Sequence, residues 1–233
     1  MSAADTITLF ALPYAGGNMW SYRRLEASLP PTIKLTGIEL PGRGRRSAEP
    51  LATSIDALAD DVSRQLRARA GGRYALFGHS MGALLGLLTI RRLAEASQPL
   101  PEVFFVSGCE APTKRTPRRR YALGTREFLD MLHEMGGCPP EVLADQELLD
   151  LFEPVLRADF QAFETWPEVS GPPLDVPIVA MRGTEDEVSE DAARAWGLET
   201  RHPMTYTEFP GGHFFLLQHW PAIGSIIRAH LKE

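Results

Sequence analysis

Short apolar runs alternate along the chain with longer stretches in which apolar residues recur at helical spacing. The short runs are rich in β-branched and aromatic residues and are bounded by glycine and proline, which is typical of buried strands. Strands are predicted over 6–12, 33–40, 74–77, 102–107, 176–182 and 204–209. Helices are predicted over 20–29, 54–70, 83–90, 190–196 and 219–231. Strands that alternate with helices in this way predict an α/β fold, with a mainly parallel sheet covered on both faces.

The alternation stops between 111 and 173, where no segment has the pattern of a strand. Amphipathic stretches over 125–135, 140–151 and 152–166 predict helices there, separated by Gly-Gly and Pro-Pro pairs. The segment is too apolar and too periodic for a disordered linker. Because 233 residues suit one α/β domain, we expect a single domain over 1–233 that contains a helical insertion at 111–173.

Composition and charge are those of an ordinary globular chain, with 44% hydrophobic residues, 23% charged residues and a net charge of −6. The negative balance implies no general attraction to nucleic acid or to an anionic membrane. No apolar run approaches the roughly 18 residues of a membrane span, and the first residues lack the pattern of a secretory signal. The two cysteines, Cys109 and Cys138, form no CxxC pair, as is typical of a reduced cytosol. We therefore expect a monomeric cytoplasmic protein without nucleic-acid or membrane partners.

The sequence Gly-His-Ser-Met-Gly at 78–82 stands between the predicted strand 74–77 and the predicted helix 83–90. In this context a Gly-x-Ser-x-Gly pattern is typical of a nucleophile elbow, a sharp turn that presents a serine hydroxyl at the edge of a sheet. The serine here is Ser80. The alternative is that Ser80 only caps a buried helix. His79 is expected to point away from the path of Ser80 and to have a packing role.

A serine nucleophile needs a base that accepts its proton and an acid that orients the base. Among the six histidines, His213 follows a Gly-Gly pair just after the last predicted strand, at the edge where open α/β sheets place their sites. Asp186 follows the predicted strand 176–182 and precedes His213, which gives the chain order serine, acid, histidine of an α/β-hydrolase. Three other carboxylates compete with Asp186 for the role of the acid: Glu185, Glu187 and Glu110.

The tetrahedral oxyanion that a serine nucleophile creates needs two backbone N–H donors. One is expected from Met81, the residue after the nucleophile. The second is expected from Tyr14 or Ala15, after the first strand, where the glycines at 16–17 let the backbone turn inward. No histidine or cysteine cluster has the spacing of a metal site, and no nucleotide-binding glycine motif is present. Neither a metal nor another cofactor is expected.

Five segments together resemble the type II thioesterases, the stand-alone editing enzymes of polyketide and nonribosomal peptide synthesis. They are LFALPYAGG at 9–17, ELPGRGR at 39–45, GHSMG at 78–82, LRADF at 156–160 and GGHFF at 211–215. The resemblance implies an α/β-hydrolase fold and a catalytic triad of Ser80, Asp186 and His213. It also implies hydrolysis of acyl groups from the phosphopantetheine thiol of acyl or peptidyl carrier proteins, so that the phosphopantetheine belongs to the partner and not to this chain.

On this resemblance the insertion is a lid whose apolar side chains cover the acyl chain and exclude water. Each of these side chains could instead only pack the lid against the core. The candidates for acyl contact are Phe128, Leu132, Leu149, Phe152, Phe160, Phe163 and, beside the predicted base, Phe214.

An arginine-rich run over 114–120 opens the insertion on a chain that is acidic overall. Carrier proteins are acidic and their arm contains a phosphate, so the run predicts a docking contact. The alternative is a solvated loop. The candidate docking residues are Arg118, Arg119 and Arg120.

Two other functions fit the same residues. A general esterase or acyltransferase acting on small-molecule esters would use the same catalytic groups. A non-catalytic binding module on a hydrolase scaffold would not need to keep Ser80, Asp186 and His213 together. Loss of labelling of Ser80 by a fluorophosphonate would favour this last interpretation.

Overall fold

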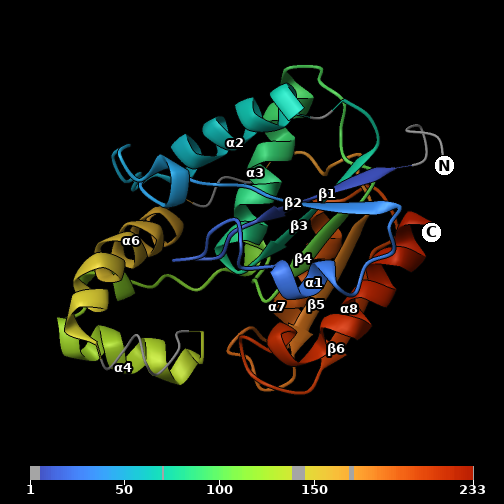
Figure 1. Cartoon of the computed structure of the whole chain (residues 1–233). Helices are drawn as coiled ribbons and strands as arrows, with labels where there is room; N and C mark the ends of the chain where they lie inside the picture. The colour runs from blue at the N-terminus through green and yellow to red at the C-terminus, as the bar shows by residue number, and fades with distance from the viewer. Residues whose placement is uncertain (1–5, 70, 138–144, 168–170, 233) are drawn as a thin grey trace.

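A computed structural model describes residues 6–69, 71–137, 145–167 and 171–232. Its centre is a six-stranded sheet in the order β2-β1-β3-β4-β5-β6, with every neighbouring pair parallel. The strands are β1 Ile7–Leu12, β2 Ile33–Gly37, β3 Tyr74–His79, β4 Phe104–Ser107, β5 Ile178–Gly183 and β6 Thr205–Phe209. The predicted α/β class with a mainly parallel sheet is confirmed (Figure 1).

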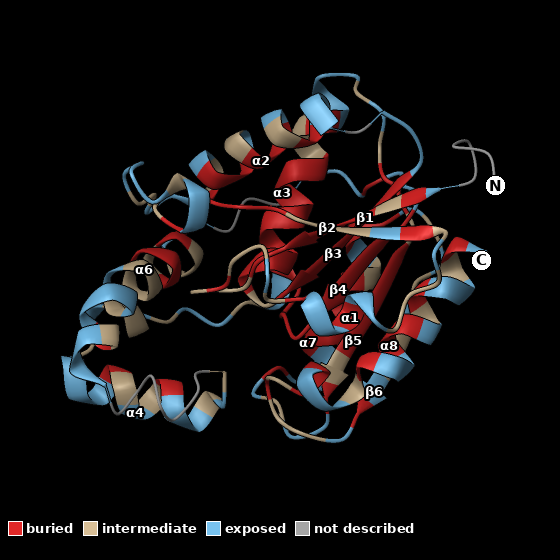
Figure 2. Ribbon diagram, viewed as in Figure 1, coloured by how far each residue is buried: buried red, intermediate tan, exposed pale blue. Residues whose placement is uncertain are grey.

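Helices cover both faces of this sheet (Figure 1). The helices α2 Ile55–Arg69 and α3 Met81–Glu95 pack against each other on one face, and α1 Arg23–Glu26 packs against α8 Leu216–Leu231 on the other. The short helix α7 Glu190–Arg194 lies beside β5. Along β1, β3, β4 and β5, side chains alternate between two apolar clusters, one on each face of the sheet. Figure 2 shows α3 almost wholly buried between α2 and the strands.

The insertion contains α4 Thr125–Met135 and α6 Gln146–Glu164, and its described residues form no strand. The prediction of separate helices over 140–151 and 152–166 is wrong, because α6 runs unbroken through the expected boundary. Its N-terminus is capped by Asp145, whose carboxylate accepts hydrogen bonds from two backbone N–H groups of the first turn. Pro154 lies inside the helix without ending it. Residues 138–144, which include part of the predicted helix 140–151, lie outside the described residues.

Most other elements differ from their predicted bounds by a few residues, and α3 extends beyond its predicted range at both ends, to Met81–Glu95. Three further differences are local. The helix predicted over 20–29 is reduced to α1, because the Asn18 side chain accepts a hydrogen bond from Trp20 N–H and holds the preceding residues in a turn. The strand predicted over 33–40 ends at Gly37, where a side chain would collide with the carbonyl oxygen of Met19 at 2.4 Å. Helix α8 begins before its predicted start and contains a non-helical residue at His219.

Candidate active site

The turn between β3 and α3 holds Ser80 in a backbone conformation that non-glycine residues rarely adopt, with φ of 54° and ψ of −120°. Such strain costs on the order of 1–3 kcal/mol and persists only where the surroundings impose it. The flanking glycines provide the space for this turn. A Cβ on Gly78 would lie 2.2 Å from the Gly82 carbonyl oxygen, and a Cβ on Gly82 would lie 2.4 Å from that of Leu12. The elbow geometry predicted from the sequence is present.

His213 and Asp186 meet at the carboxyl ends of β6 and β5. The Nδ1 atom of His213 lies 3.0 Å from Oδ1 and 3.2 Å from Oδ2 of Asp186. The Asp186 side chain is fully buried and that of His213 is 7% exposed, so water does not compete for this contact. Within the described part of the chain, the buried Nε2 atom of His213 has no hydrogen-bond partner. A carboxylate on Nδ1 fixes the tautomer that leaves Nε2 free to accept a proton.

The competing carboxylates are engaged elsewhere or exposed. Glu110 binds the Arg118 guanidinium, at 3.0 Å, and accepts a hydrogen bond from Thr116 N–H, also at 3.0 Å. Glu187 pairs with arginines of the insertion, and Glu185 is exposed. Of the four predicted candidates, Asp186 is the one that contacts His213.

Ser80 and His213 line one cavity of about 260 Å³ between the sheet edge and the insertion. Tyr14 and Ala15, the predicted second oxyanion donors, line the same cavity. Their loop is closed by a hydrogen bond of 2.8 Å from Gly17 N–H to the Tyr14 carbonyl oxygen. Met81 is the first residue of α3, a position whose N–H has no partner within the helix. The structure therefore brings the predicted oxyanion residues to the same edge as Ser80.

The apolar wall of the cavity only partly matches the predicted residues. Leu132, Phe160 and Phe214 line it, whereas Phe128 and Phe163 do not. Phe128 lies behind Phe160, with ring centroids 5.6 Å apart in an edge-to-face arrangement, and is fully buried. Phe163 packs on the core under the guanidinium of Arg115. Phe128 therefore supports the wall from behind, whereas Phe163 belongs to the main core. Phe152, also predicted to cover the acyl chain, lines the cavity, whereas Leu149 does not. Two apolar lining residues were not predicted from the sequence: Met135 and Leu156.

A buried ion pair joins the insertion to the loop that carries Tyr14 and Ala15. Asp159 of α6 is fully buried and binds the Arg43 guanidinium through both carboxylate oxygens, at 2.6 and 2.7 Å. The same carboxylate accepts a hydrogen bond of 2.8 Å from Gly16 N–H. In the sequence, 39–45 and 156–160 indicated only a family resemblance. One motif contains Arg43 and the other contains Asp159, and these opposite charges were the signal in the sequence for this contact.

His79 is fully buried, as packing requires, but it lies beside the predicted base. Its ring centroid is 5.0 Å from that of His213, and its Nδ1 lies 3.0 Å from Ser107 Oγ. Burial, and secondarily the neighbouring His213, lower the pKa of His79 well below its ordinary value. A neutral imidazole is therefore packed directly behind His213, a neighbour that the sequence did not indicate.

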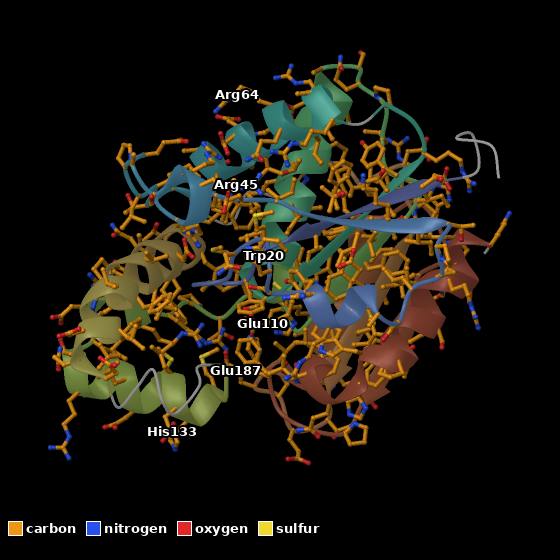
Figure 3. All side chains as sticks on the ribbon, in the orientation of Figure 1. Trp20, Arg45, Arg64, Glu110, His133 and Glu187 are labelled. Carbon is orange, nitrogen blue, oxygen red and sulfur yellow. The ribbon has the colours of Figure 1, made fainter. Side chains whose placement is uncertain are left out.

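The predicted docking arginines divide into two kinds. Arg118 pairs with Glu110 and Glu187, and Arg120 pairs with Glu164 and Glu187. These pairs connect the insertion to loops after β4 and β5, on the side where Figure 3 labels Glu110 and Glu187. Arg119 alone of the three is exposed. Two of the three charges are thus neutralised within the molecule, and the docking role of this run stays a prediction.

No three His, Cys, Asp or Glu side chains among the described residues are grouped so as to hold a metal ion. No helix formed by those residues is long and apolar enough to cross a membrane.

The parallel sheet with its serine-bearing strand–helix turn defines the fold as that of the α/β-hydrolases. Within that class, the chain belongs to the thioesterase family, because the thioesterase domain matches residues 7–231. It is 34% identical over 229 residues to the thioesterase PikA5 of Streptomyces venezuelae, covering 97% of this chain and 82% of the relative. It is 31% identical over 220 residues to the gramicidin S biosynthesis protein GrsT of Aneurinibacillus migulanus, covering 94% and 86%.

Two solved structures resemble this one over nearly its whole length. The type II thioesterase BorB from the borrelidin biosynthetic cluster matches with a TM-score of 0.85 and 37% sequence identity, covering 97% of this chain and 92% of that chain. The thioesterase RedJ from the prodiginine pathway of Streptomyces coelicolor matches with a TM-score of 0.88 and 30% identity, covering 96% and 91%. The resemblance to type II thioesterases expected from the five sequence segments is confirmed.

Proposed function

We propose that this chain is a type II thioesterase that hydrolyses acyl groups from the phosphopantetheine thiol of acyl or peptidyl carrier proteins. The observation that carries the proposal is the buried contact between His213 and Asp186. It leaves Nε2 of His213 without a partner among the described residues, and His213 lines the same cavity as Ser80. The names of the relatives support the carrier-bound substrate, since BorB is a type II thioesterase of a biosynthetic cluster and GrsT is a gramicidin S biosynthesis protein.

In the first half of the reaction, Nε2 of His213 takes the proton of Ser80 Oγ as Oγ attacks the thioester carbonyl carbon. Asp186 holds the resulting imidazolium through its Nδ1–H. The negative charge on the carbonyl oxygen is stabilised by the Met81 N–H and by an N–H from Tyr14 or Ala15. The tetrahedral intermediate collapses when the carbon–sulfur bond breaks, and His213 gives its proton to the departing thiol. The acyl group is then an ester on Ser80.

In the second half, His213 accepts a proton from a water molecule, whose oxygen attacks the acyl-serine carbonyl carbon. The same backbone donors hold the second oxyanion. His213 then returns the proton to Ser80 Oγ as the ester bond breaks, which releases a carboxylic acid and restores the starting state. A thioester is already activated, so modest catalytic assistance suffices for a broad range of acyl groups.

The insertion over 111–173 acts as the lid in this proposal. Leu132 and Phe160 provide apolar wall opposite Ser80, and Phe214 continues it beside the base. At about 260 Å³, the cavity lies just below the roughly 300–1,000 Å³ of typical small-molecule pockets. We therefore propose that short acyl groups are the preferred cargo in this arrangement of the lid.

The test is deacylation of a panel of carrier proteins loaded with acyl chains of increasing length, followed by mass spectrometry of the intact carrier. The wild-type chain should return carriers to the free thiol, with short chains fastest, and Ser80→Ala should not. A serine-directed fluorophosphonate should label the wild type at Ser80 and leave Ser80→Ala unlabelled. If the wild type deacylates no carrier in the panel, or does so no better than it cleaves simple esters, the proposed function is wrong.

A further inference from the structure

A second hollow of about 510 Å³ lies at the open edge of the sheet. It is bounded by the edge strand β2, by α1, by the end of α2 and by the loops that follow β1 and β2. The loop after β1 separates this hollow from the active-site cavity. Gly17, Asn18 and Ser21 line the cavity, while Met19 and Trp20 line the edge hollow. One short loop is thus a common wall of both.

Four cations on the rim of this hollow are exposed and make no ion pair with any other described residue: Arg23, Lys34, Arg45 and Arg69. They come from four different elements, so folding alone brings them together. Two acidic residues, Glu26 and Glu39, also line the hollow, and Glu39 is buried. On a chain with a net charge of −6, the rim has a local excess of positive charge, since the four unpaired cations outnumber the two carboxylates. It contrasts with Arg118 and Arg120, whose charges are met by carboxylates of this chain.

Trp20 stands on the same rim with 61% of its surface exposed. Its position is fixed by the loop, because Asn18 Oδ1 accepts a hydrogen bond of 2.8 Å from Trp20 N–H and Ser21 Oγ accepts one of 2.9 Å from Asn18 N–H. Figure 3 shows Trp20 and Arg45 between the strands and the insertion in this view. Tryptophan and arginine are the residues most enriched where binding energy concentrates in protein interfaces. An exposed tryptophan on an anchored loop, surrounded by cations that make no ion pair with the described residues, is therefore suited to binding an anionic protein surface.

We propose that this edge hollow, with Trp20 as its apolar anchor and Arg23, Lys34 and Arg45 as its cations, docks the carrier protein. The inference rests on the proposed function. The carrier is acidic and attaches its arm through a phosphate, so both features complement the rim. A carrier seated there lies across one loop from Ser80, and its arm can pass over that loop into the cavity.

The proposal is tested with two substrates that carry the same acyl group, one on the carrier protein and one on free pantetheine. The variants are Trp20→Ala and the triple charge reversal Arg23→Glu, Lys34→Glu and Arg45→Glu. The control is Arg119→Glu, which reverses an exposed charge on the insertion. The triple variant should raise KM for the acyl carrier by about tenfold or more at low salt, since each exposed ion pair contributes up to about fivefold. Its kcat/KM for acyl pantetheine should stay that of the wild type.

Each outcome decides something different. A wild type that does not deacylate the carrier removes the proposed function itself. A wild type that does, with triple and Trp20→Ala variants that match it on both substrates, removes only the docking surface. Equal losses on both substrates would mean that the changes damage the shared loop and that the hollow does not dock the carrier. If Arg119→Glu alone raised KM for the carrier, docking would belong to the arginine run of the insertion. Binding of single-stranded DNA that the triple variant loses, with unchanged carrier kinetics, would assign the cations to nucleic acid.

Discussion

Asp159 lies on the insertion, yet its carboxylate binds the loop that supplies one of the predicted oxyanion donors. One oxygen accepts hydrogen bonds from Gly16 N–H and from Arg43, and the other accepts a second bond from Arg43. Asp159→Asn keeps the shape of the side chain and removes its charge. We expect this variant to lose stability and catalytic rate for two separable reasons, and the structure provides a way to measure them apart.

The stability loss follows from burial. Arg43 and Asp159 side chains are 7% and 0% exposed, and removing one partner of a buried ion pair costs about 3–5 kcal/mol because the other charge remains. For a chain of this size each kcal/mol shifts Tm by about 2–4 °C, so a decrease of roughly 10 °C is expected.

The rate loss follows from the position of Gly16. Its N–H anchors the turn that holds Tyr14 and Ala15, and complete removal of one oxyanion donor costs on the order of 10²–10³ in kcat. Misplacing a donor should cost less, so we expect kcat to fall by about 10–100-fold for a small thioester. KM should change little, because neither Asp159 nor Arg43 lines the cavity.

The matched control is the double variant Arg43→Met with Asp159→Leu. Replacing a buried ion pair with apolar side chains of similar volume is often neutral or stabilising, so Tm should recover. Leucine offers no acceptor to Gly16 N–H, so kcat should stay low. Thermal unfolding and steady-state kinetics, measured well below Tm, give both numbers. Recovery of kcat together with Tm in the double variant would refute the positioning role and leave Asp159 a purely structural residue.

Three further changes probe other parts of the site. Asp186→Asn should lower kcat by roughly 10³–10⁴-fold by releasing the His213 tautomer, and wild-type kcat in this variant would exclude Asp186 as the acid. Burial, and secondarily His213, lowers the pKa of His79. Below about pH 6.5 the unfolded chain therefore binds a proton at this histidine that the native chain does not bind. As the pH decreases, this group should lower the free energy of unfolding by about 1.4 kcal/mol per pH unit. His79→Asn should remove that slope in denaturant titrations at several pH values, whereas an unchanged slope would mean that His79 is protonated in the native state. Leu132→Trp fills part of the cavity and should lower kcat/KM for long acyl chains about tenfold relative to short ones, because excluding two methylenes loses about 1.6 kcal/mol of binding free energy. Equal effects on all chain lengths would place the acyl chain elsewhere.

The sequence predicted those features that depend on local pattern and chain order. Strand and helix periodicity gave the parallel sheet, and the glycines around Ser80 gave the elbow. The order of Asp186 and His213 after two successive strands brought them to one sheet edge, as the structure now shows with a direct hydrogen bond. Helix ends were predicted wrongly where no strong helix breaker marks them, as between residues 151 and 152, which both lie inside α6.

Contacts between distant segments could not be predicted in the same way. Arg43 and Asp159 are 116 positions apart, and nothing in either motif states which partner it meets. The arginine run showed its charge in the sequence, but whether Arg118 and Arg120 face solvent or carboxylates depends on where β4, β5 and α6 place Glu110, Glu187 and Glu164. The exposed cations of the edge hollow are scattered over four elements, so no window of sequence contains them together.

Helix α6 is bonded to the loops on both sides of Ser80, which makes it part of the site and not a detachable cover. Near the middle of α6, buried Asp159 binds the loop that carries the predicted oxyanion donors Tyr14 and Ala15. At its end, buried Glu164 binds Arg120, which also binds Glu187, the neighbour of Asp186. The first anchor is desolvated on both sides and strong, whereas Glu187 is 42% exposed and its pair contributes little. A displacement of α6 that admits a substrate would therefore move the loop of the predicted oxyanion donors before it moves Asp186, and we expect catalysis to need α6 in the position described here.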